Sequence, residues 1–266
     1  MDLQLTGRHV LVTGASKGIG FACARGFLQE GARVSLVSRS AEGLQLAAEQ
    51  LLNEVPGAVG RIAIFPADLQ NAAAAQAALD AAEAAHGPVD VLLNCAGAAK
   101  RTAPADLQPQ AWHDAMQAKY FTYIHMMDPL VKRMGQRGRG VIINIVGAGG
   151  KVANPTHLAG GAANAALMLV SAGLAAAYAG KGVRINAINP GSVLTERLRQ
   201  RLDAETRLAE TEGRPAPSDP GAKLPLGRVA QPEEIANVAV FLASPRASYV
   251  TGAIVAMDGA ATPMVV

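Results

Sequence analysis

The stretch Val10-Leu-Val-Thr-Gly-Ala-Ser-Lys-Gly-Ile-Gly20 decides the fold of this chain. It begins as an apolar run typical of a buried strand and then passes three glycines, Gly14, Gly18 and Gly20, before a helix-compatible segment. Glycine permits backbone angles and close approaches that a Cβ atom would prevent. A helix that follows such a turn points its unpaired N–H groups and the positive end of its dipole at an anion. The stretch therefore predicts a phosphate-binding turn between the first strand and the first helix.

Apolar runs rich in β-branched residues alternate with longer helix-compatible segments along the rest of the chain. Near-continuous apolar strands separated by helices predict a parallel sheet that is covered on both faces. The length of 266 residues suits a single α/β domain, a doubly wound parallel sheet spanning residues 1–266. An alanine-rich segment at 71–85 is expected to be helical, because alanine has the highest helix propensity. The expected strands are residues 8–13, 34–38, 62–66, 89–94, 141–145, 183–189 and 253–257.

The composition argues against several classes of function. The net charge is only +3 and no basic run is interleaved with aromatic residues, so nucleic acid is not an expected partner. Two cysteines, Cys23 and Cys95, suggest reduced, buried thiols rather than a disulfide framework or a metal site. The N-terminus lacks the charged-then-apolar pattern of a secretory signal, and we expect a cytoplasmic protein.

The segment between Lys151 and Lys181 contains no Asp, Glu, Lys or Arg and is long enough to span a bilayer. Most of it is alanine and glycine, which contribute little to membrane insertion compared with leucine or phenylalanine. We therefore predict a helix of a soluble protein, packed on its own sheet and against a neighbouring subunit, and no membrane contact.

Three further motifs follow apolar runs at set distances from the glycine turn. Asp68-Leu69 follows the third run, Asn94-Cys-Ala-Gly97 the fourth, and Asn189-Pro-Gly-Ser-Val-Leu-Thr195 the sixth. With these motifs at these spacings, the chain resembles the classical short-chain dehydrogenase/reductase family over essentially its whole length. The resemblance implies a seven-stranded Rossmann fold with the cofactor at the carboxyl ends of the strands. It also implies a small-molecule substrate, a substrate lid at about 196–228, and a homo-oligomer, either a dimer or a tetramer.

The end of the second apolar run indicates which nicotinamide cofactor is used. An acidic residue at this place binds the free ribose hydroxyls of NAD and would repel the 2′-phosphate of NADP. Here the sequence is Ser38-Arg39-Ser40, without a carboxylate, and Arg39 offers a donor fork that suits a phosphate. Lys17, inside the glycine turn, adds a second cation. We predict NADP(H) rather than NAD(H); the alternative is that both cations are ordinary solvated surface charges.

The resemblance also assigns the cofactor contacts residue by residue. The glycine turn would bind the phosphates, Ser38 and Arg39 the 2′-position, and Asp68 the adenine amino group. The full set expected to bind the cofactor is Gly14, Ser16, Lys17, Gly18, Ile19, Gly20, Ser38, Arg39, Asp68, Leu69, Asn94, Ala96, Gly97, Pro190, Gly191, Val193 and Thr195.

The family pattern fails at the positions that carry its chemistry. Family members reduce a carbonyl with an asparagine, a serine, a tyrosine and a lysine. The serine position here is Gly147, or alternatively Val146, and thirteen residues after Gly147 the tyrosine position is Gly160. The lysine position is Asn164 and the asparagine position is Lys119. We expect the two glycines to leave open space that admits a bulky substrate.

Lys119 and Asn164 have thus exchanged residue types, and the exchange could compensate for the missing lysine or be a chance substitution. His157 precedes Gly160 by about one helical turn, and the usual pKa of histidine suits proton donation near neutral pH. An ordinary contact at a helix start is the alternative for His157. Two functions remain open. One is an oxidoreductase with a rearranged site in which Lys119, His157 and Asn164 act; the other is a cofactor-binding regulator or structural partner without turnover.

Overall fold

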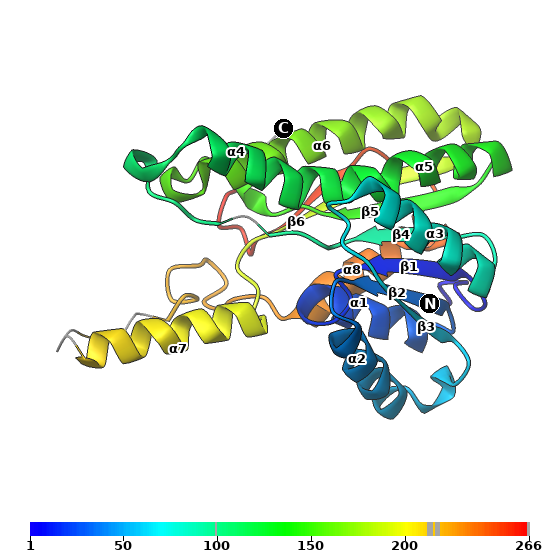
Figure 1. Cartoon of the computed structure of the whole chain (residues 1–266), viewed down its shortest axis with the longest axis horizontal. Coiled ribbons are helices and arrows are strands. Elements are labelled where there is room, and N and C mark those ends of the chain that lie inside the picture. Colours follow the sequence, from blue (N-terminus) through cyan, green and yellow to red (C-terminus); the bar gives the residue numbers. More distant parts are fainter. Residues whose placement is uncertain (99, 212–214, 216–218, 265–266) are drawn as a thin grey trace.

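Seven parallel strands form one central sheet in the order β3-β2-β1-β4-β5-β6-β7 (Figure 1). The computed structural model describes residues 1–98, 100–211, 215 and 219–264. The strand order reverses beside β1, and this switch point opens a crevice outside the carboxyl ends of the strands. The predicted strands are confirmed, with boundaries that differ by no more than two residues. They are β1 (His9–Thr13), β2 (Arg33–Ser38), β3 (Ile62–Pro66), β4 (Val91–Asn94), β5 (Gly140–Ile145), β6 (Val183–Pro190) and β7 (Ile254–Met257).

Helices cover both faces of the sheet, as the uninterrupted apolar strands predicted (Figure 1). One face carries α1 (Gly18–Gln29), α2 (Ala41–Glu54) and α8 (Pro232–Ala243). The other face carries α3 (Ala72–His86), α5 (Thr122–Arg137) and α6 (Leu158–Tyr178). The alanine-rich segment is α3, and its N-cap Asn71 accepts a hydrogen bond from the Ala74 N–H at 3.0 Å.

A π-helical turn over Met116–Phe121 joins α4 (Pro109–Ala115) to α5. Two side chains just after the turn fix it to the sheet. The Thr122 hydroxyl lies 3.2 Å from the Ala96 carbonyl, and the Tyr123 hydroxyl donates to the Ile145 carbonyl at 2.6 Å. Such turns occur frequently at functional sites, and this one contains Lys119.

The apolar segment that could span a membrane by length and composition is Pro155–Lys181. Its central part is α6, whose Ala163, Leu167 and Ala175 are buried against the rest of the chain. The core helix of a soluble protein passes the same test of length and hydropathy, so the fold accounts for this segment without a membrane.

The predicted lid at 196–228 begins as α7 (Glu196–Thr211), which extends away from the body of the molecule (Figure 1). Residues 212–214 and 216–218 of the predicted lid lie outside the described residues. Closure over a substrate therefore stays a prediction.

His9 is a fully buried titratable group at the amino end of β1. Its Nδ1 donates to the Gly87 carbonyl at 2.6 Å, and its Nε2 accepts from the Ser35 hydroxyl at 2.8 Å. Burial lowers the pKa of His9 from 6.5 to about 4. The unfolded chain therefore binds a proton here at a higher pH than the folded chain does.

This difference predicts a pH dependence of stability. Neutral His9 makes its full contribution to the free energy of unfolding above pH 6.5, and this contribution is lost as the pH falls toward 4. Between pH 7 and pH 4 the free energy of unfolding should fall by about 3 kcal/mol more in the wild type than in His9→Gln, which does not titrate. Urea unfolding of both proteins across this range measures the difference, and parallel pH profiles would contradict the assignment.

Candidate cofactor and active site

A cavity of about 890 Å³ opens at the carboxyl ends of the central strands. It gathers nearly all of the residues predicted to bind a cofactor, although they come from five separate strand ends. The predicted residues that line it are Gly14, Ser16, Lys17, Gly18, Ile19, Ser38, Arg39, Asp68, Leu69, Ala96, Gly97, Lys119, Pro190, Gly191, Val193 and Thr195.

The glycine turn has the geometry that a pyrophosphate needs. Gly14 has a φ of +66°, and a Cβ on it would lie 2.9 Å from the Ala96 backbone. A Cβ on Gly18 would lie 3.3 Å from the Thr195 methyl group, so the segment between β6 and α7 closely approaches the start of α1. The first N–H groups of α1 have no intrahelical partner and can bind an anion.

Two cations lie in this turn and after the second strand, and the described residues give neither a counter-charge. Lys17 and Arg39 both line the cavity and are exposed, and neither makes an ion pair within the part of the chain that the structure describes. The Ser38 hydroxyl is buried without a hydrogen-bond partner among those residues. Ser40 accepts from the Gly43 N–H at 3.0 Å and caps α2. These groups fit a phosphate, because each offers a donor or a charge that the described residues leave unused.

Two residues predicted to bind the cofactor lie outside the cavity lining. Gly20 packs against the Gly14 carbonyl, so it serves the turn rather than the cofactor directly. Asn94 is buried below the cavity and donates to Asn144 Oδ1 at 3.0 Å, and Asn144 in turn donates to the Ser171 hydroxyl at 2.8 Å. Asn94 therefore links β4 to β5 and, through Ser171, to α6.

Lys119 lies in the wall of the cavity and reaches the end of β5. Its Nζ lies 3.3 Å from the Tyr123 hydroxyl, 3.4 Å from the Ile145 carbonyl and 5.0 Å from the centre of the Tyr123 ring. A Cβ on Gly97 would lie 2.9 Å from Lys119 Cδ, so only glycine leaves room for this path of the side chain. Burial raises the pKa of Tyr123 well above its usual value. Tyr123 is thus a neutral, buried support for the ammonium group.

The space at the serine position is only partly open. Gly147, rather than the buried Val146, lines the cavity. A Cβ on Gly147 would lie 3.2 Å from Asn164 Nδ2, and a Cβ on Gly149 would lie 3.0 Å from His157 Cδ2. Side chains from α6 and from the turn before it therefore occupy one side of the space beside Gly147, and admission of a bulky substrate stays a prediction.

The loop after β5 and the start of α6 are in backbone contact. A Cβ on Gly161 would lie 2.7 Å from the Gly149 carbonyl oxygen, and a Cβ on Gly150 would lie 2.7 Å from the Ala165 amide nitrogen. The glycines thus allow α6 to approach this loop closely enough for Asn164 to lie directly behind Gly147. Of the three predicted catalytic residues, Lys119 lines the cavity, whereas His157 and Asn164 lie behind its described lining.

His157 differs from the sequence-based expectation in its charge. Burial, with the nearby Arg101 and Lys119 cations, lowers the pKa of His157 below 6.5. The imidazole is therefore neutral at pH 7 and suits accepting a proton better than donating one. Its Nδ1 is buried without a partner among the described residues. The Arg101 guanidinium lies 3.4 Å from the hydroxyl of Thr156, the residue before His157.

Other lining residues were not predicted from the sequence to bind the cofactor or to act in catalysis. Most of them directly follow a strand or lie next to a residue predicted to bind the cofactor. Their position at the carboxyl edge of the sheet could therefore have identified them from the sequence. They are Ser40, Ala67, Gln70, Cys95, Ala98, Ala118, Thr122, Ile145, Gly147 and Glu196.

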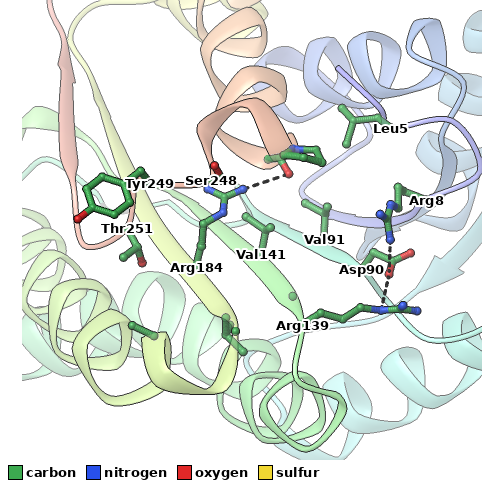
Figure 2. Close-up of a pocket in the computed structure, with 16 residues that line it drawn as sticks. Leu5, Arg8, Asp90, Val91, Arg139, Val141, Arg184, Ser248, Tyr249 and Thr251 are labelled. Carbon is green, nitrogen blue, oxygen red and sulfur yellow. Dashed lines mark hydrogen bonds and ion pairs between the residues drawn. The ribbon is translucent and has the colours of Figure 1, made fainter. Parts of the chain in front are cut away.

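A second cavity of about 530 Å³ lies at the amino ends of the strands (Figure 2). Arg8 and Arg139 flank Asp90 there, at 3.6 and 3.8 Å from the same carboxylate oxygen. Arg184 donates to the Leu242 and Val250 carbonyls at 2.9 and 3.1 Å. The charged groups of this basal cavity are thus paired within the chain, at the edge of the sheet opposite to the glycine turn.

The comparisons with known proteins agree with this arrangement. The chain matches the protein family described as enoyl-(acyl carrier protein) reductase over residues 14–262. D-threitol dehydrogenase of Mycolicibacterium smegmatis is 37% identical over 262 residues, which cover 98% of this chain and 95% of that protein. This chain belongs to the short-chain dehydrogenase/reductase family. Galactitol 2-dehydrogenase of Cereibacter sphaeroides is also 37% identical to this family member, with 97% of this chain and 96% of that one covered.

Two solved structures of the family match nearly the whole chain. L-sorbose reductase of Gluconobacter frateurii, in complex with NADPH and L-sorbose, has a TM-score of 0.90 at 28% identity, with 100% of both chains covered. An NADPH-bound short-chain oxidoreductase of Pseudomonas aeruginosa, described as containing an atypical catalytic center, has a TM-score of 0.86 at 29% identity. That comparison covers 98% of this chain and 99% of the other.

Proposed function

We propose that this family member is an NADP(H)-dependent oxidoreductase that interconverts a carbonyl and an alcohol with a non-standard set of catalytic residues. One observation carries the proposal. The Lys119 ammonium is held in the cofactor cavity, at the end of β5, by the Tyr123 hydroxyl and the Ile145 carbonyl. A cation at this place can hold a ribose hydroxyl and stabilise negative charge on a substrate oxygen.

The proposed cofactor is NADP(H), and NAD(H) is the weaker alternative. Solved relatives are complexes with NADPH, and Lys17 and Arg39 lie beside the place where a 2′-phosphate would bind. When bound, the cofactor supplies or accepts the hydride. Lys17, Arg39 and the start of α1 would hold its phosphates, and Thr195 would close over the glycine turn.

Lys119 is the proposed source of the proton. In reduction its Nζ–H points toward the substrate oxygen and gives up a proton as negative charge develops there. In oxidation the same amine takes the proton back. His157 is not assigned this proton, because its lowered pKa argues against the expected role as a donor near pH 7.

The proposed substrate is a polyol or the corresponding ketose. Relatives that align over nearly the whole chain are named for threitol and galactitol, and a solved relative binds L-sorbose. The Pseudomonas neighbour is described as an oxidoreductase containing an atypical catalytic center, which supports a non-standard active site in the same fold. By analogy with the family we expect a cytoplasmic homo-oligomer, a dimer or a tetramer.

A substrate panel tests the proposal. Purified protein with NADPH should reduce ketoses, and with NADP⁺ it should oxidise polyols. Simple ketones and β-ketoacyl thioesters should react negligibly, because glycine at positions 147 and 160 leaves their alkoxide without a phenol and a hydroxyl. Nicotinamide absorbance follows turnover, and deuterium transfer from labelled NADPH into the product confirms the hydride step.

The alternative is a cofactor-binding regulator or a structural partner without turnover. The absence of a side chain at Gly160 favours it. Tight NADPH binding together with no turnover of any ketose or polyol would select this alternative.

A further inference from the structure

Asn164 lies directly behind Gly147, which lines the cofactor cavity. The residue is only 4% exposed, and its Oδ1 is buried without a hydrogen-bond partner in the described part of the chain. Buried polar groups are costly when unpaired, and native proteins retain few of them. The described residues alone therefore do not fix the Asn164 carboxamide, whose Nδ2 is the end nearest to Gly147.

Gly147 lies between the carboxamide nitrogen and the cavity. A Cβ on Gly147 would lie 3.2 Å from Asn164 Nδ2, and a Cβ on Gly149 would lie 3.9 Å from the same nitrogen. Gly147 itself lines the cavity and has no side chain to cover what lies behind it. The amide nitrogen thus occupies the place where the end of a small side chain at position 147 would lie.

The neighbouring hydroxyl groups are already engaged. The Tyr123 hydroxyl donates to the Ile145 carbonyl at 2.6 Å, and the Thr122 hydroxyl lies 2.8 Å from the Lys119 carbonyl. Lys119 Nζ lies 3.4 Å from the carbonyl of Ile145, two residues before Gly147. Lys119 and Asn164 therefore approach the end of β5 from two different helices.

We infer that the Asn164 carboxamide is a catalytic group that donates a hydrogen bond to the carbonyl oxygen of the substrate, beside the Lys119 ammonium. As hydride reaches the carbonyl carbon, the C=O π pair moves to the oxygen. Asn164 N–H stabilises the negative charge without transferring a proton, and Lys119 supplies the proton that completes the alcohol. This inference rests on the proposed function and assigns Asn164 to the substrate rather than to the cofactor ribose.

The first test separates these two assignments. Asn164→Ala should lower kcat for ketose reduction by about 10²-fold, the effect of removing one preorganised donor. Its Kd for NADPH should stay within about twofold of the wild type, because the ribose loses no contact. Asn53→Ala, an exposed asparagine on α2, is the matched control. An unchanged kcat, or a loss of NADPH affinity as large as the loss of kcat, would overturn the inference.

The second test returns a donor to the same place from the loop after β5. Gly147→Ser alone should not raise activity, because its Cβ would crowd Asn164 Nδ2 at 3.2 Å. In Gly147→Ser/Asn164→Ala the crowding is absent and the serine hydroxyl can reach the same oxygen. We expect kcat to recover by about tenfold or more over Asn164→Ala. No recovery in a double variant with wild-type melting temperature and NADPH affinity would count against a donor at this place.

A third measurement does not depend on turnover. The side-chain amide signals of Asn164, identified by their loss in Asn164→Ala, should shift when L-sorbose is added to the NADP⁺ complex, in which reduction cannot occur. A shift without any turnover would refute the proposed function but support the hydrogen bond from Asn164 to the ligand. Turnover with unshifted signals would refute that hydrogen bond but support the proposed function.

Discussion

Lys119→Ala should lower kcat for ketose reduction by about 10²–10⁴-fold, the range by which general acid–base groups accelerate reactions. It should also weaken NADPH binding by about 1–3 kcal/mol, because ribose hydroxyls would be left without a partner. Both effects follow from the position of Nζ, between the cavity and the end of β5. Stopped-flow reduction and calorimetric titration with NADPH measure the two quantities separately.

Lys132→Ala is the matched control, because Lys132 lies on α5 and forms an exposed ion pair with Asp128. Such an exposed pair contributes little to stability, so its loss should leave the fold intact. We therefore expect kcat for ketose reduction and the affinity for NADPH to stay unchanged. The double variant Lys119→Asn/Asn164→Lys should recover much of the lost NADPH affinity, since neighbouring positions are coupled rather than additive. If Lys119→Ala left NADPH affinity and turnover unchanged, the exchange of residue types between positions 119 and 164 would have no functional role.

The second large effect concerns cofactor choice. The wild type should bind NADPH at least about tenfold more tightly than NADH, a difference of ~1.4 kcal/mol that one charge-assisted pair can supply. Arg39→Ala should remove most of this preference by weakening NADPH binding while leaving NADH binding nearly unchanged. Calorimetry with both cofactors, at two salt concentrations, measures the preference and its electrostatic part.

Arg139→Ala provides the comparison, because Arg139 is an exposed arginine at the opposite edge of the sheet. It should leave the ratio of the two affinities unchanged. Equal affinities for NADPH and NADH in the wild type would show that Arg39 and Lys17 are ordinary surface charges.

The fold could be predicted from sequence because its signals are local. Each strand is a short apolar run, and the turn at Gly14 and Gly18 carries its own backbone requirement. The order of the strands and the crevice beside β1 follow from the family resemblance rather than from any single run. The π-helical turn at Met116–Phe121 was not predicted, since its cause is tertiary: Thr122 and Tyr123 bond to the ends of β4 and β5.

The site was harder to predict than the fold because its contacts join distant residues. Gly147 suggested empty space when considered alone, yet Asn164, seventeen residues later by number, occupies one side of that space. The charge of His157 depends on its burial and on two cations from other segments. Asn94 had the residue type of a ribose ligand, but its amide binds Asn144 on the neighbouring strand.

The backbone contact between the loop after β5 and α6 bears on how the cofactor exchanges. Gly149 and Gly150 lie close to Gly161 and Ala165, so a separation of this loop from α6 would break tight backbone contacts. We therefore expect this side of the site to keep its position when the cofactor exchanges. Opening for NADP⁺ release is then expected from the segment that runs from Pro190 through Thr195 into α7. Hydrogen exchange should accordingly be slow in the first turns of α6 and fast after β6.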